Sequence, residues 1–109
     1  MPLRRAYCLS VAAAIALIAS PLSAAQNPER VTTGRLLAQS LCADCHTMGG
    51  ATRSDRGPPD FAAIGAMPSM TALSIKVFLR SPHANMPDVQ LDDQQIEALT
   101  AYILDLGGK

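Results

Sequence analysis

The run Cys42-Ala43-Asp44-Cys45-His46 constrains this chain more than any other feature. A Cys-x-x-Cys-His run is typical of a c-type haem attachment site. Two thiols at this spacing add to the two vinyl groups of one porphyrin, and the imidazole that follows reaches the iron from the same face. The run therefore predicts one covalent haem c on Cys42 and Cys45, with His46 as an axial ligand of the iron.

Two other uses of a Cys-x-x-Cys pair agree less well with the rest of the chain. A structural zinc site takes four Cys or His ligands, usually from two separated pairs. His83 is the only other histidine, however, and no cysteine follows Cys45. A thioredoxin-like dithiol would need a βαβ context, and no strand pattern is present. We therefore expect haem attachment.

The N-terminus is typical of a secretory signal peptide. A basic pair at positions 4–5 precedes an apolar stretch at 9–18, which is too short to span a bilayer comfortably, and small residues follow up to Ala25. We expect residues 1–25 to be the signal peptide and residues 26–109 to form one domain in the periplasm. An uncleaved N-terminal anchor is the alternative.

Cleavage after Ala25 would leave 84 residues (109 − 25), and domains this small often rely on a metal or cofactor. Cys8 would be lost, so the two haem-binding cysteines would be the only ones left and no disulfide is expected. Seven basic residues would face nine acidic ones, which gives a formal charge of −2 (7 − 9). A negative charge argues against nucleic acid as a partner.

The apolar periodicity predicts an all-α domain of three to four short helices with long loops. No helix is expected at residues 47–66, because this stretch is rich in Gly and Pro. Loops of this length are reasonable in a compact domain only if they wrap something, such as a haem. The expected helices run from about Val31 to Leu41, from the N-cap Thr71 to about Arg80, and from the N-cap Asp92 to Gly107-Gly108.

Two of these helices carry apolar stripes that we expect to be buried. The stripe on the helix after Thr71 consists of Ile75, Phe78 and Leu79. The stripe on the last helix consists of Ile96, Leu99, Ile103 and Leu106.

Met86 is the best candidate for the second axial ligand. It lies in a loop between Pro82 and Pro87, forty residues after His46 (86 − 46), which leaves enough chain to reach the opposite face of the ring. A thioether opposite a histidine raises the reduction potential of a haem.

Four other side chains are alternatives to Met86. Met48 is too close in sequence to the haem motif to reach the opposite face of the ring. Met67 and Met70 are expected to fill gaps in the core, and His83 is expected to face solvent.

Taken together, these motifs resemble the class I c-type cytochromes, small bacterial proteins with a single haem, over essentially all of residues 26–109. Gly57-Pro58 resembles the family's Gly-Pro-x-Leu segment, whose proline carbonyl accepts a hydrogen bond from the ligand histidine. The resemblance thus implies that Pro58 orients His46 and raises its basicity. Asp60 stands where the family usually has leucine.

Two further pairs carry the resemblance. Met86-Pro87 resembles the family's axial Met-Pro. Gly34 and Tyr102 resemble the pair at which the first and last helices cross closely, where glycine allows the approach.

The resemblance implies the cytochrome c fold, wrapped around one covalent haem and its iron, and one-electron transfer. With His46 and Met86 both on the iron, no catalytic residue and no small-molecule substrate are expected, so the protein would not be an enzyme. We expect a periplasmic electron carrier, or the small cytochrome partner of a periplasmic dehydrogenase, reductase or oxidase. No stable membrane insertion is expected if the signal peptide is cleaved.

Two other functions remain open. A haem-based ligand-binding sensor or peroxidase would need a labile sixth position, and His83 would be the distal base of a peroxidase. A membrane-tethered subunit of an oxidase or reductase would need the N-terminal segment to be retained.

Basic residues lie between the haem motif and Met86, at Arg53, Arg56, Lys76 and Arg80. They form either an ordinary solvated surface or a basic rim that steers an acidic partner. Arg53 or Arg80 could also pair with a haem propionate.

Overall fold

The structure is a computed structural model that describes residues 26–49, 57–81 and 85–109. Over these residues it contains helices and no strand, so the all-α prediction is confirmed. The predicted signal peptide, residues 1–25, lies outside the described residues. The helices are α1 (Pro28–Leu41), α2 (Phe61–Ala66), α3 (Ala72–Arg80) and α4 (Asp93–Leu106).

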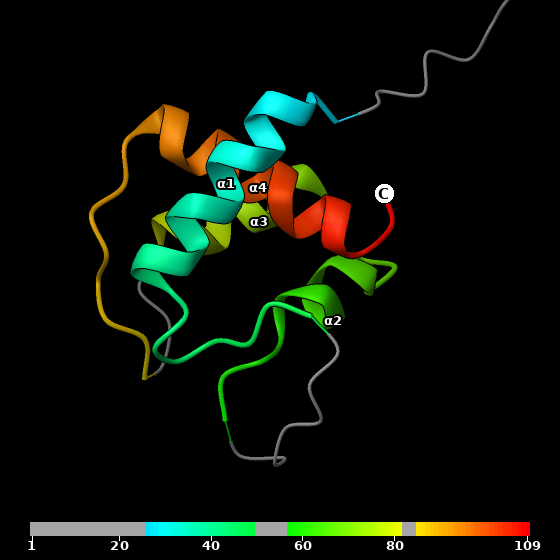
Figure 1. Cartoon of the computed structure of the whole chain (residues 1–109). Coiled ribbons are helices and arrows are strands. Elements are labelled where there is room, and N and C mark those ends of the chain that lie inside the picture. Colours follow the sequence, from blue (N-terminus) through cyan, green and yellow to red (C-terminus); the bar gives the residue numbers. More distant parts are fainter. Residues whose placement is uncertain (1–25, 50–56, 82–84) are drawn as a thin grey trace, which may run out of the picture.

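Helix α4 is the centre of the domain. Each of the other three described helices packs against α4, and none of them packs against another of the three (Figure 1). On α4, Leu99, Ile96 and Ile103 are only 1–3% exposed, which confirms these three positions of the predicted stripe. Leu106, at the end of that stripe, is only partly buried. Among the described residues, no helix combines the length and apolar character needed to cross a membrane.

Helix α1 begins three residues before the predicted start, because Asn27 caps it. The Asn27 Oδ1 atom accepts hydrogen bonds from the backbone N–H groups of Glu29 (2.9 Å) and Arg30 (3.3 Å). Pro28 is the first helical residue, a position that suits its fixed φ and missing N–H. At the other end, α1 leads directly into Cys42 and so carries the haem motif.

Helix α2 corrects the expectation of a continuous loop over residues 47–66. Asp60 caps this helix, and its Oδ1 atom accepts hydrogen bonds from the N–H groups of Ala62 (2.8 Å) and Ala63 (3.3 Å). Gly65 allows α2 to lie against α4, since a Cβ there would be 2.0 Å from the carbonyl oxygen of Ile103. Six residues are too few for a helical periodicity to be recognisable in the sequence.

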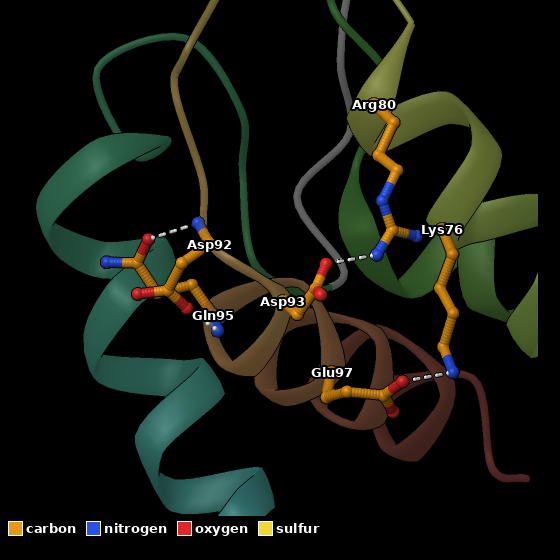
Figure 2. Close-up of polar contacts among 6 residues, drawn as sticks. All are labelled: Lys76, Arg80, Asp92, Asp93, Gln95 and Glu97. Atoms are coloured by element: carbon orange, nitrogen blue, oxygen red, sulfur yellow. Dashed lines mark hydrogen bonds and ion pairs between the residues drawn. The ribbon is translucent and has the colours of Figure 1, made fainter.

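The two predicted N-caps are confirmed. Thr71 and Ser74 form a reciprocal capping box at the start of α3, and Asp92 and Gln95 form another at the start of α4 (Figure 2). Gly107 ends α4, as predicted.

The predicted stripe on α3 is only partly buried. Ile75 is 3% exposed and Leu79 is half-buried, but Phe78 is 53% exposed, so the prediction was wrong for Phe78. The reason is that α3 presents Ile75 to the core, while the ring of Phe78 borders a cleft. Met67, predicted to fill a core gap, is exposed, whereas Met70 does pack against the core.

Helices α1 and α4 cross at the predicted glycine. A Cβ on Gly34 would lie 2.0 Å from the carbonyl oxygen of Ala98 and 2.8 Å from the Cβ of Tyr102. No side chain fits in this space, so the two backbones meet directly. Tyr102 is buried beside the crossing, and burial raises the pKa of its hydroxyl.

Two ion pairs join α3 to α4 (Figure 2). Lys76 pairs with Glu97, and the Arg80 guanidinium donates to Asp93 over 2.6 Å. The partners are four residues apart on each helix, so the pairs lie one turn from each other. The hydrogen bond from Lys76 is the main reason that the pKa of Glu97 is lowered. Both cations of α3 are therefore paired with carboxylates of α4.

Candidate haem site

The four residues predicted to bind haem meet at one cleft. Two adjoining cavities form the cleft, and Cys42, His46 and Met86 line both of them. Cys45 lines one of the two, which we call the outer cavity. Residues from two distant parts of the sequence thus come to one place.

The other cavity, which we call the inner cavity, has apolar walls. Its empty space is about 720 Å³, a volume that includes solvent space at the open side of the cavity. Beyond the predicted ligands, its lining includes Phe61 from α2, Phe78 and Leu79 from α3, and Leu99 and Ile103 from α4. Apolar walls with a few polar groups at fixed places are typical of a cofactor site.

The outer cavity lies between two loop segments. Pro58 and Pro59 line it from the segment before α2, and Pro87 and Val89 line it from the segment after α3. Leu41, the last residue of α1, adds an exposed apolar side chain. Prolines restrict the backbone of both segments, so the two loops are limited in how they can move around the cleft.

A tight turn after α1 holds the haem motif. The backbone N–H groups of Cys45 and His46 both donate to the carbonyl of Cys42, over 3.1 and 2.8 Å. Cys42 is half-buried and Cys45 is exposed. Burial raises the pKa of the Cys42 thiol, which favours its protonated form.

The His46 ring is held by a hydrogen bond and by an aromatic neighbour. Its Nδ1 atom lies 2.8 Å from the carbonyl oxygen of Pro59. A carbonyl only accepts, so Nδ1 carries the proton and the lone pair of Nε2 is available to a metal. The Phe61 ring lies 4.8 Å away between centroids, tilted by 41°. These contacts fix both the tautomer and the orientation of the imidazole.

The hydrogen bond corrects the prediction for Pro58. The acceptor is the carbonyl of Pro59, so the match to the family's Gly-Pro-x-Leu segment is shifted by one residue. With this shift, Asp60 takes the variable position of the Gly-Pro-x-Leu segment and also caps α2. The buried Phe61 takes the position of the leucine. Two consecutive prolines concealed this shift in the sequence.

Met86 occupies the cleft differently from the other methionines. It is half-buried and lines both cavities. Met70 lines only the inner cavity, and its sulfur accepts a hydrogen bond from the Ser74 hydroxyl at 3.4 Å. Met48 packs against the core. His83, the other alternative, lies outside the described residues.

A comparison with known families agrees with this geometry. A family model described as cytochrome C oxidase, cbb3-type, subunit III matches residues 29–103. The chain belongs to this family of c-type cytochrome domains. The matched region of the cytochrome begins in α1 and ends in α4, so it includes the haem motif and Met86. No curated protein and no solved structure gave a match.

Family and geometry together establish the cytochrome c fold and imply a haem with a role in electron transfer. The residues present fit that group. The cleft has two thiols on one turn, an imidazole with its Nε2 lone pair available, and apolar walls. Arg80 was a candidate for a haem propionate, but in this structure it pairs with Asp93. Arg53, the other candidate, and Arg56 lie outside the described residues.

Proposed function

We propose that this cytochrome transfers single electrons through one haem c, held covalently by Cys42 and Cys45, with the iron between His46 and Met86. One observation carries the proposal: His46 and Met86, forty residues apart (86 − 46), line the same two cavities as Cys42. Bound there, the haem supplies an iron that alternates between Fe(III) and Fe(II).

The surrounding residues have defined tasks in this function. The Pro59 carbonyl accepts a hydrogen bond from the Nδ1–H group of His46, which fixes the tautomer and leaves Nε2 to the metal. The Met86 thioether favours the reduced iron and so raises the potential. Because protein side chains take both axial positions, no position is left for a substrate, which supports a carrier rather than an enzyme.

We also propose that the cytochrome is exported to the periplasm and that residues 1–25 are a cleaved signal peptide. The basic, apolar and small-residue order of this segment supports export. The partners would be redox proteins, namely a periplasmic dehydrogenase, reductase or oxidase, and contacts of this kind are small and transient. The pairing of Lys76 and Arg80 with α4 favours an ordinary solvated surface over a basic rim on α3.

An optical spectrum of the purified holoprotein tests the axial ligands. We expect a weak far-red charge-transfer band in the oxidised form and a reduced spectrum that carbon monoxide does not change. Met86→Ala should lose the band and bind carbon monoxide. Met67→Ala is the matched control, because Met67 is exposed and lines neither cavity, and it should behave as the parent. Ready carbon monoxide binding by the parent would contradict His/Met ligation and favour a ligand-binding haem protein.

Intact mass spectrometry of the exported protein tests attachment and processing. We expect the mass of residues 26–109 plus one haem under denaturing conditions, since a thioether-linked haem stays with the chain. Replacing Cys42 and Cys45 with serine should abolish the added mass. A mass that retains residues 1–25 would support the membrane-tethered alternative.

A further inference from the structure

Asn85 has an unusual backbone conformation at the edge of the cleft. Its φ is +65°, and no other described residue except Gly108 has a positive φ. L-residues rarely adopt this left-handed region, and Asn is one of the few that tolerate it. The Asn85 side chain is exposed, and the residue lines the outer cavity beside Met86. The backbone of Asn85 therefore sets the direction in which the chain enters Met86.

The two residues that follow Asn85 are also restricted. Met86 precedes a proline, which disfavours the helical region for Met86 and favours an extended backbone. Pro87 has its own φ fixed near −65° by its ring. Three consecutive residues with few backbone options thus lead the chain past the cleft. A segment limited in this way loses little conformational freedom when Met86 binds.

We propose that Asn85 is a positioning residue, whose left-handed backbone presents the Met86 thioether to the iron on the side opposite His46. The inference rests on the ligation by Met86 put forward under the proposed function. A residue that disfavours positive φ would turn the chain away from this path, and Met86 would then leave the iron more often. Glycine, which adopts positive φ without steric penalty, would keep the path open.

Imidazole binding to the oxidised holoprotein measures how readily Met86 leaves the iron. Imidazole takes the position that Met86 vacates, so its apparent affinity rises with the fraction of detached Met86. We expect Asn85→Ala to raise this affinity roughly 5- to 30-fold, the range that corresponds to the usual penalty for a left-handed L-residue. The far-red band should weaken in the same variant, and Asn85→Gly should stay closest to the parent in both measurements.

Gly108 provides a matched control. Its φ is +77° and a Cβ there would meet nothing within 4 Å, so Gly108→Ala introduces a backbone penalty of the same kind away from the cleft. This variant should be less stable to urea without any change in imidazole affinity. An equal rise of affinity in Gly108→Ala would mean that general loosening is the cause, and would overturn the proposal.

The remaining outcomes separate this inference from the proposed function. A parent protein without the far-red band would refute ligation by Met86, and the inference would fall with it. If the parent has the band while Asn85→Ala binds imidazole as the parent does, ligation stands and the role of Asn85 is refuted. If Asn85→Gly and Asn85→Ala raise the affinity equally, the side chain rather than the backbone matters, which also refutes the proposal.

Discussion

Substituting Gly34 by alanine tests the crossing on which the fold depends. In a free helix, alanine is more favourable than glycine by about 1 kcal/mol. At this position the new Cβ would lie 2.0 Å from the carbonyl oxygen of Ala98, a backbone atom of α4 that cannot rotate away. Overpacking of a core typically destabilises by about 1–3 kcal/mol, and a clash with backbone belongs at the upper end or above. The net expectation is a loss of at least about 2 kcal/mol.

Thermal unfolding of the holoprotein, followed by far-ultraviolet circular dichroism, measures this loss. For a domain of this size, about 2 kcal/mol lowers Tm by roughly 8–16 °C. Ser40→Ala is the control, since Ser40 lies on the exposed side of the same helix, and it should change stability by only a few tenths of a kcal/mol. A Gly34→Ala protein as stable as the parent would refute the reasoning, because helix propensity would then outweigh the clash.

Glu97→Gln removes the carboxylate that pairs with Lys76, and the parent should be more stable than this variant by about 0–1 kcal/mol. Folding lowers the pKa of Glu97, so this difference in stability is fully present above the ordinary pKa of about 4.5. It is lost as the pH falls through the lower pKa of the folded state. Urea unfolding at pH 7 and pH 3 checks this, and a constant difference between the two proteins would contradict it. Thr71→Ala breaks the capping box of α3 and should destabilise by about 1 kcal/mol in the same assay, whereas no change would mean that the cap contributes nothing. Phe61→Ala empties a buried site beside His46 and should destabilise by about 3–5 kcal/mol in a thermal melt, while a loss below 1 kcal/mol would contradict its place in the core.

The parts of the fold that were predictable are those with local chemical signals. Thr71 and Asp92 are followed three residues later by side chains that can complete a capping box, and α3 and α4 begin where these residues predict. Gly107 marks the end of α4 for a similarly local reason. Helix α1 begins earlier than its apolar residues predict, because Asn27 caps it.

The features that escaped prediction depend on contacts between distant residues. Helix α2 is one such feature, because it can lie against α4 only where Gly65 leaves room beside the carbonyl of Ile103, and no pattern within six residues can reveal that approach. The exposure of Phe78 likewise depends on which side of α3 faces α4. The spacing of Phe78 from Ile75 is correct for one stripe, yet it cannot separate the core from the edge of a cleft.

The candidate site likewise combines features that a local sequence motif predicts with contacts that only the fold reveals. The thiols and His46 follow from a motif within five residues, and the structure brings Met86 to their cleft. Adjacent prolines, by contrast, cannot be told apart as hydrogen-bond acceptors from sequence. Only the fold shows that the Pro59 carbonyl faces the imidazole.

The crossing of α1 and α4 also governs how the domain can assemble. Gly34 and Ala98 are 64 residues apart in the chain (98 − 34), and closing a loop of that length opposes folding by about 4 kcal/mol beyond the constant term. Each of the other three described helices finds its packing partner only in α4. In a nascent chain, α1, α2 and α3 therefore cannot pack one after another before α4 has formed. The chain has to wait for its last described helix, so the domain should fold as one cooperative unit with few stable fragments.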